Sequence, residues 1–207
     1  MSKRVVVLGG FSTGPELLEP VVNAAVGAGL AYDGEVITFP RGMKDPECVG
    51  RAVKDQLALS HSAGALVLRP YMRPSKYVAY NGPEPRSVPQ LVSAATRKTF
   101  QSLGRVVSGP DRAEHARLLT YDGLELARHP VAYLTKVPRI AGFSTYANLE
   151  MLDPDIDASA VVTSGDIFFP YDPQSVPQGV RVTLVPGLHD ELLIHPAEML
   201  QTIKAVA

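Results

Sequence analysis

Hydrophobic residues in this chain gather in short runs, and the first run does not alternate with polar residues. The first run, 4–8, is built around three consecutive valines. Continuous β-branched runs of this kind are typical of strands buried on both faces, as in a parallel sheet covered by helices. Further strands are predicted from residue 57 and at 35–39, 77–80, 160–163 and 180–185.

Segments with helical spacing separate these runs. Apolar residues recur at helical intervals from Leu17 to Ala25, and the spacing of Thr13 and Glu16 matches a capping box. Pro20 is compatible with a helix that begins near Leu17, because the first four N–H groups of a helix need no partner. Asp45-Pro46 predicts the start of a second helix, and 196–206 forms a last amphipathic one. Six strands alternating with helices predict an α/β fold with a mostly parallel sheet.

The segment 83–139 differs from the rest of the chain. Its hydrophobic pattern is helical and is interrupted by prolines and glycines. Nine basic residues stand against five acidic ones, a balance of +4, whereas 140–207 has two against nine, a balance of −7. We interpret 1–207 as one domain with 83–139 as a helical cap inserted over the sheet. The alternative is that 83–139 is simply the helical layer of the domain.

The composition narrows the function classes. The 207 residues are 45% hydrophobic and 20% charged, with a formal net charge of −1, which gives no overall case for nucleic acid or an anionic membrane as partner. The apolar runs are too short to span a membrane. The lone Cys48 excludes an intrachain disulfide and a cysteine zinc cluster. We therefore expect a cytoplasmic protein that acts on a small molecule and uses no metal or cofactor.

The strongest chemical signal is the segment Ser60-His61-Ser62-Ala63-Gly64, which follows an apolar run directly. The pattern predicts a buried strand, a sharp turn and the start of a helix, with Ser62 at the apex. It is a variant of the G-x-S-x-G nucleophile elbow in which Ser60 takes the place of the first glycine.

Other reactive residues follow neighbouring strands. In open parallel sheets, ligands bind beyond the carboxyl ends of the strands. The residues at those ends are Gly9-Gly10-Phe11, Ser62, Asp166 and His189. A serine hydroxyl is a weak nucleophile unless a base takes its proton, and a carboxylate can orient a histidine for that task. The order Ser, Asp, His therefore favours a nucleophilic triad.

With these pieces in order, the chain resembles the α/β-hydrolase superfamily. The resemblance rests on segment 60–64, on Gly165-Asp166, on Gly187-Leu188-His189 and on the loop Gly9-Gly10-Phe11. It spans nearly the whole chain and implies a minimal six-stranded version of the fold, without the family's first two antiparallel strands. Gly9 stands where the family usually has a histidine.

The resemblance also implies roles for individual residues. Ser62 would be the nucleophile, His189 the base and Asp166 the acid that orients it. The backbone N–H groups of Phe11 and Ala63 would form the oxyanion hole. These roles imply a serine hydrolase that forms an acyl-enzyme, most simply a carboxylic ester hydrolase.

Each assignment has a rival. His195 competes with His189 as the base, although Pro196 follows it at the start of the last helix. Asp190 and Asp172 compete with Asp166, but Asp190 adjoins His189, and neighbours on an extended chain point apart. Ser62 could also be an ordinary buried turn serine. We expect His61 to pack beneath the elbow, and His115 and His129 to lie on the surface of the cap.

Other functions are compatible with the same residues. The triad could serve acyl transfer, cofactor-free peroxidation or carbon–carbon cleavage, or the fold could be a catalytically inactive binding protein. A phosphate cradle at 5–10 is disfavoured, because its glycines do not match G-x-G-x-x-G and no acidic residue ends the second strand.

Overall fold

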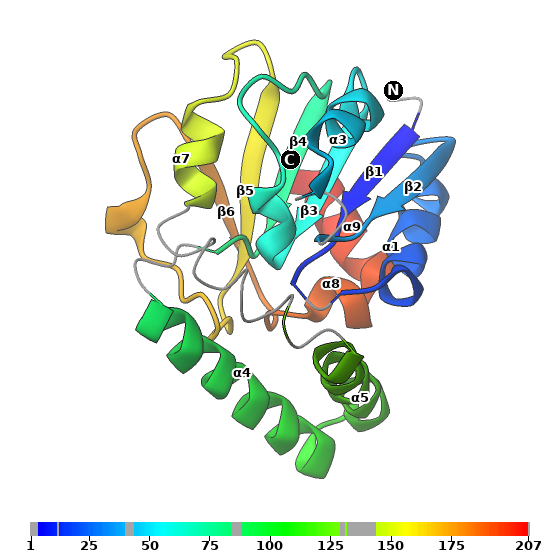
Figure 1. Ribbon diagram of the computed structural model, residues 1–207, viewed down its shortest axis with the longest axis vertical. Helices are drawn as coiled ribbons and strands as arrows, with labels where there is room; N and C mark the ends of the chain where they lie inside the picture. The colour runs from blue at the N-terminus through cyan, green and yellow to red at the C-terminus, as the bar shows by residue number, and fades with distance from the viewer. Residues whose placement is uncertain are drawn as a thin grey trace.

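The described strands form one parallel sheet (Figure 1). The computed structural model describes residues 4–11, 13–39, 44–83, 88–128, 131 and 144–206. The strand order is β2-β1-β3-β4-β5-β6, and every described pairing is parallel. The predicted α/β class with a six-stranded sheet is confirmed. The strands are β1 (Arg4–Leu8), β2 (Asp33–Ile37), β3 (Leu57–His61), β4 (Lys76–Tyr80), β5 (Asp157–Thr163) and β6 (Arg181–Val185).

The register brings the carboxyl ends of the strands level. Leu8 of β1 pairs with Ser60, and His61 of β3 pairs with Tyr80, each at or next to the last residue of its strand. Thr163 and Val185 end β5 and β6 as a pair. The loops that follow these strands therefore start side by side along one edge of the sheet.

Helices cover both faces of the sheet, which explains the runs without alternation. Val5 and Val7 point into a core under α1 (Pro15–Gly27), α8 (Glu191–Ile194) and α9 (Pro196–Val206). Val6 and Leu8 point into a second core that is covered by α3 (Pro46–Val53) and α7 (Thr145–Glu150). Figure 1 shows the two sets of helices on opposite sides of the strands. Successive residues from Val5 to Leu8 are thus all buried, and they alternate between the two cores.

Two predicted helix starts have different outcomes. Helix α3 begins as predicted, with the Asp45 carboxylate accepting from the Cys48 N–H at 2.9 Å. Helix α1 begins earlier than predicted, at Pro15, and Gly14 caps it without a side-chain bond. The capping-box prediction is wrong, because the Glu16 carboxylate accepts instead from the Tyr121 hydroxyl at 2.8 Å. Pro20 lies inside this helix.

The helix predicted after the elbow is only a short 3₁₀ turn, η1 (Ser62–Leu66). An α-helix would need the N–H of residue 70 to reach the Leu66 carbonyl, and residue 70 is a proline. The Arg69 guanidinium donates to that carbonyl instead, at 3.1 Å. Pro70 thus cannot donate to the Leu66 carbonyl, and the Arg69 side chain satisfies this acceptor.

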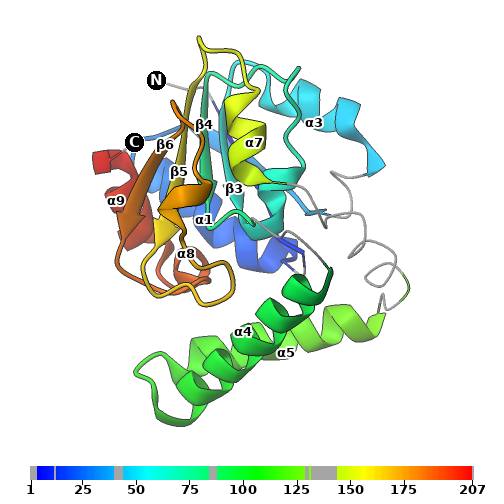
Figure 2. The ribbon, with the colours of Figure 1, turned by 90° about the vertical axis from the view of Figure 1, so that its left-hand side faces the viewer.

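Two long helices occupy the segment predicted as a cap. Helices α4 (Val88–Ser108) and α5 (Arg112–Arg128) lie together beyond one end of the sheet (Figure 2). The rest of segment 83–139, apart from Pro83, 109–111 and Val131, lies outside the described residues.

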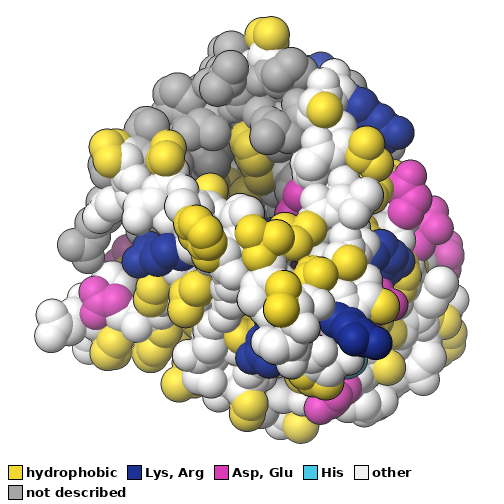
Figure 3. All heavy atoms as spheres, turned by 90° about the horizontal axis from the view of Figure 1, so that it is seen from below, with side chains coloured by type: hydrophobic (Ala, Val, Ile, Leu, Met, Phe, Trp, Pro, Cys, Tyr) yellow, Lys and Arg dark blue, Asp and Glu magenta, His cyan; other side chains and the backbone are white. Residues whose placement is uncertain are grey.

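The face seen in Figure 3 shows hydrophobic and basic side chains together. No helix in the described parts of the chain is long and apolar enough to cross a bilayer. On α4, Val92, Phe100, Leu103 and Val107 are exposed.

We predict that Gly64→Ala destabilises the protein strongly. A methyl group at this position would lie 2.1 Å from the Leu8 carbonyl oxygen, a backbone atom at the end of β1. Relieving that overlap needs movement of two strand ends and should cost at least about 2 kcal/mol of unfolding free energy. Urea denaturation measures the effect. Gly27→Ala is the matched control, since nothing lies within 4 Å of that site, and equal stability of the two variants would contradict the prediction.

Candidate active site

Ser62 occupies a sharp turn directly after β3. Its φ is +52°, in the left-handed region that costs a residue with a side chain about 1–2 kcal/mol. Small neighbours permit the turn, because a side chain at Gly10 would meet the Ser62 Cβ at 2.9 Å. Ser60, the departure from the elbow pattern, is buried and its hydroxyl lies 2.8 Å from the Tyr77 hydroxyl. A serine is accommodated there because β4 supplies its partner.

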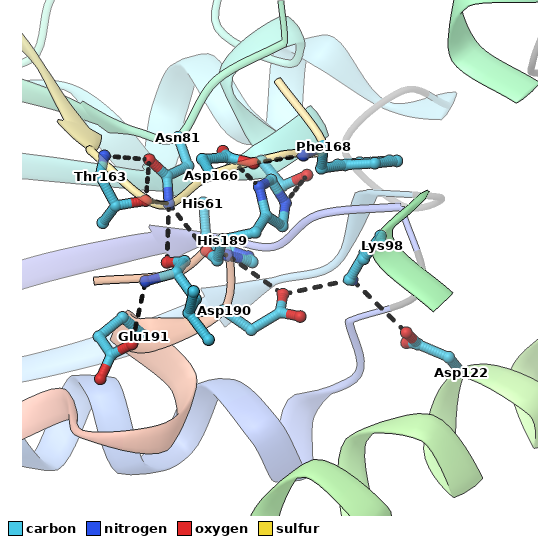
Figure 4. A network of polar contacts seen from close by, with 12 residues as sticks. His61, Asn81, Lys98, Asp122, Thr163, Asp166, Phe168, His189, Asp190 and Glu191 are labelled. Carbon is cyan, nitrogen blue, oxygen red and sulfur yellow. Dashed lines mark hydrogen bonds and ion pairs between the residues drawn. The ribbon is translucent and has the colours of Figure 1, made fainter. Parts of the chain in front are cut away.

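The structure brings Ser62, His189 and Asp166 into one hydrogen-bonded chain. Figure 4 shows the His189 and Asp166 part of this chain. The Oγ of Ser62 lies 3.0 Å from Nε2 of His189, and Nδ1 of His189 lies 2.7 Å from Oδ2 of Asp166. All three residues are buried. An ionised carboxylate can only accept, so Nδ1 carries the imidazole proton. Nε2 is then the acceptor for the serine hydroxyl, which is the arrangement that a general base requires.

Two aromatic residues after Asp166 hold the Asp166 carboxylate and the His189 ring in place. The N–H groups of Phe168 and Phe169 donate to Oδ1 of Asp166 at 2.8 and 3.0 Å. Their rings meet the His189 ring edge-on, with centroids 4.8 and 5.6 Å away. Sequence reasoning missed this role. The available signal was a pair of phenylalanines two and three residues after a strand-end aspartate.

Asn81 joins the two loops that carry the acid and the base. It follows β4 with φ +47° and is buried. Its Nδ2 donates to the His189 carbonyl at 2.8 Å and to Oγ1 of Thr163 at 2.9 Å, while its Oδ1 accepts from the Thr163 N–H at 2.8 Å. Sequence reasoning did not single out Asn81. One amide side chain therefore fixes the end of β5 relative to the loop that holds His189.

A second buried polar group lies beside His189. His61 has its Nε2 3.2 Å from the His189 carbonyl and 3.7 Å from Oδ1 of Asp190, and its Nδ1 has no hydrogen-bond partner among the described residues. Asp190 is paired with Lys98 of α4, at 3.2 Å. Burial lowers the pKa of His61 to about 4, and the neighbouring His189 adds to this effect. His61 is therefore neutral at pH 7 and buried, as expected for a residue packed near the elbow.

The rival residues have other partners. Asp172 caps a short 3₁₀ turn, η2 (Pro173–Ser175), and accepts from the Gln174 N–H at 3.0 Å. His195 is half-buried and lies 3.4 Å from Asp111 of the segment between α4 and α5. His115, predicted at the surface, is buried on α5, so that prediction is wrong. Its burial depends on the packing of α5 against the rest of the protein. His129 lies outside the described residues.

The loop predicted to form an oxyanion hole lies next to the elbow. Gly10 contacts Ser62 so closely that a Cβ would overlap it, and the Phe11 ring packs 5.5 Å from that of Phe39. Ala63 follows Ser62 directly in η1. These placements bring Gly10 of the predicted loop and Ala63 to the same serine.

Three nearby groups have the residue types of a metal site. One ligand atom each of His61, His189 and Asp190 lies within 4.8 Å of the others. The His189 and Asp190 atoms already have partners, since both His189 nitrogens contact Ser62 or Asp166 and Asp190 pairs with Lys98. A cation here would have to break those contacts.

The architecture can be compared with solved structures. An enol-lactonase from Burkholderia xenovorans LB400 aligns with all of this chain and 91% of its own length, with a TM-score of 0.67 and 13% identity. A hydrolase from Pseudomonas aeruginosa PA01 covers 99% of this chain and 89% of its own, with a TM-score of 0.63 and 14% identity. An epoxide hydrolase from Bacillus megaterium covers 100% of this chain and 93% of its own, with a TM-score of 0.54 and 13% identity.

This chain has the α/β-hydrolase fold. No protein-family model matches the sequence, and no curated protein sequence matches it significantly. The likeness therefore lies in the α/β-hydrolase architecture, which the present chain builds from six parallel strands in the part that the structure describes.

We predict that Asn81→Ala lowers stability by at least about 2 kcal/mol. The change leaves the buried Thr163 N–H without its acceptor and removes the shorter of two contacts to the buried His189 carbonyl, and an unsatisfied buried group costs about 1–3 kcal/mol. Thermal and urea denaturation measure the loss. Asn23→Ala, at an exposed position of α1, is the control and should change stability by less than about 0.5 kcal/mol. Similar effects of the two substitutions would refute the role of Asn81 in fixing the two loops.

We predict a pH dependence of stability that is due to His61. Because its pKa in the folded protein is lowered to about 4, the unfolded chain binds a proton more tightly between pH 6.5 and 4. Acid therefore favours unfolding in this window, and the wild type should lose about 3 kcal/mol more than His61→Gln between pH 7 and 4. Glutamine retains an N–H donor for the His189 carbonyl. Parallel pH dependences of the two proteins would rule out this contribution.

Proposed function

We propose that this protein is a serine hydrolase that cleaves small carboxylic esters through an acyl-enzyme. The observation that carries the proposal is the continuous hydrogen-bonded chain from Ser62 through His189 to Asp166. It begins at a serine held at positive φ at the carboxyl end of β3. Fixed contacts for both nitrogens of the histidine are what nucleophilic catalysis by serine requires.

In the first step, the Ser62 Oγ attacks the ester carbonyl while Nε2 of His189 takes the hydroxyl proton. The resulting imidazolium is stabilised by the Asp166 carboxylate, which the Phe168 and Phe169 N–H groups hold in place. The tetrahedral intermediate then collapses, and the imidazolium gives its proton to the departing alkoxide. An alcohol leaves, and the acyl group remains on Ser62.

The negative charge on the tetrahedral oxygen needs donors that are already in place. We assign this role to the backbone N–H groups of Phe11 and Ala63. The contact of Gly10 with Ser62 supports the assignment, because it holds the loop against the nucleophile. Removal of one such donor typically costs 10²–10³-fold in rate.

The second step repeats the same chemistry with water. His189 takes a proton from water, the hydroxide attacks the acyl carbonyl, and Ser62 regains its proton as the carboxylic acid leaves. We place the substrate between the strand ends and the pair α4–α5, so that these helices act as the cap. The choice of an ester is supported by the enol-lactonase among the similar structures, since a lactone is a cyclic ester.

The test uses a fluorophosphonate probe and p-nitrophenyl acetate. We expect the probe to label Ser62, as read by peptide mass spectrometry. Ser62→Ala should lose both labelling and at least about 10³-fold of ester hydrolysis, because no nucleophile remains. Ser159→Ala, a change at another buried serine, is the control and should retain both activities. Unimpaired hydrolysis by Ser62→Ala, or the absence of any labelling of wild type, would overturn the proposal.

A further inference from the structure

Helix α4 contacts both loops that carry the proposed base and acid. The Nζ of Lys98 lies 3.2 Å from Oδ1 of Asp190, the residue after His189. One turn further on, Nε2 of Gln101 donates to the carbonyl of Gly165, the residue before Asp166, at 3.3 Å. The same helix is therefore fixed to the β5 loop and to the β6 loop. Figure 4 shows Lys98 reaching from the cap toward this network.

Lys98 is held by more than one group. Its ammonium lies 3.5 Å from Asp122 of α5 and 5.6 Å from the centre of the Phe168 ring. That ring in turn meets the His189 ring. Only 20% of the Lys98 side chain is exposed. One cation from the cap thus touches two of the neighbours that surround the proposed base.

Asp190 is close enough to His189 to influence its charge. A carboxylate oxygen of Asp190 and a ring nitrogen of His189 lie within 4.8 Å of each other. At such a distance, an opposite charge typically shifts a titration by 1–3 pH units. The Asp190 carboxylate would therefore stabilise an imidazolium, and the Lys98 ammonium beside it counteracts this effect.

Both partners are charged throughout the working pH range. Burial acts to raise the pKa of Asp190, but Lys98 outweighs it, with help from His189 and His61, and the pKa falls to about 2. Burial acts to lower the pKa of Lys98, yet Asp190 and Asp122 raise it above its ordinary value. The pair is thus a buried ammonium and carboxylate, not two neutral groups.

We propose that Lys98 and Asp190 are positioning residues whose buried ion pair links the cap to the catalytic histidine and balances the charge beside it. This inference rests on the proposed hydrolase function. The ion pair holds the Asp190 backbone, and with it the His189 loop, in register with α4. Its two opposite charges act in opposite directions on the imidazolium that His189 becomes during catalysis.

Other charged or titratable groups also face this region. From the elements around His189 they are His61 of β3, Tyr80 of β4, Asp166 after β5, Asp122 and His115 of α5, and Glu191 of α8. None of them changes in the substitutions used below, so the comparison isolates the Lys98–Asp190 pair.

The experiment measures kcat/KM for p-nitrophenyl acetate, and the rate of fluorophosphonate labelling, as functions of pH. Lys98→Met exposes the base to the unbalanced Asp190 charge, so the acid limb of both profiles should move to higher pH by about one unit. Asp190→Asn leaves the Lys98 charge, so the limb should move by a similar amount to lower pH. In the double variant both charges are gone, and the limb should return close to that of wild type.

Two further variants separate charge from folding. Removal of one buried partner is itself destabilising, so Lys98→Arg, which keeps the charge, should retain the wild-type limb even if it is less stable. Arg97→Met, at an exposed neighbouring cation of α4, should leave the profiles unchanged. Circular dichroism verifies that each variant is folded at the temperature of the assay.

The outcomes are distinct. Opposite shifts in the single variants, with restoration in the double variant, support the proposal. Loss of rate without a shift of the limb, or shifts in the same direction, would overturn it and leave the pair a purely structural role. A wild-type protein that neither hydrolyses esters nor reacts with the probe would instead overturn the hydrolase function itself.

Discussion

The close approach of the Ser62 elbow to the end of β1 is the constraint on which the rest of the site depends. Gly64 packs against the Leu8 carbonyl with no room for a side chain, and Gly10 packs against Ser62 from the other side. These contacts hold Ser62 at a φ of +52°, a conformation that a free serine would avoid. The strain of the turn is thus supported by two glycines, by the buried strand β3 and by the buried end of β1.

Around this fixed serine, the parallel register brings the other groups to the same edge. Level strand ends place the loops after β5 and β6 next to the elbow, and Asn81 ties these loops together. Backbone N–H groups rather than side chains orient the Asp166 carboxylate. The geometry of the candidate triad therefore depends mostly on backbone contacts, which the sheet keeps rigid.

The buried charges near His189 connect helix α4 to the site. Lys98 and Asp190 lose hydration, and each compensates the other at 3.2 Å. Such a pair is weak evidence for added stability, because desolvation offsets the attraction. It fixes relative position well, however, because either charge left alone in the interior would be costly. This property suits a contact between α4 and the loop that carries His189.

The sequence by itself determined the sheet and the order of the strand-end residues. The continuous β-branched run 4–8 favours a buried strand on local grounds alone. Ser62, Asp166 and His189 each follow a predicted strand, so the sequence identified them as candidates before the structure was considered. A local signal also determined the start of α3, where Asp45 caps its own helix.

Only the tertiary structure decided which side chains meet partners far away in the sequence. Glu16 bonds to Tyr121 instead of capping α1, His115 is buried by the packing of α5, and Lys98 meets Asp190 across 92 positions of sequence. The role of Asn81 likewise depends on carbonyl and N–H groups more than 80 residues away. These interactions have no periodicity and no local motif, because their partners become neighbours only when the sheet has formed.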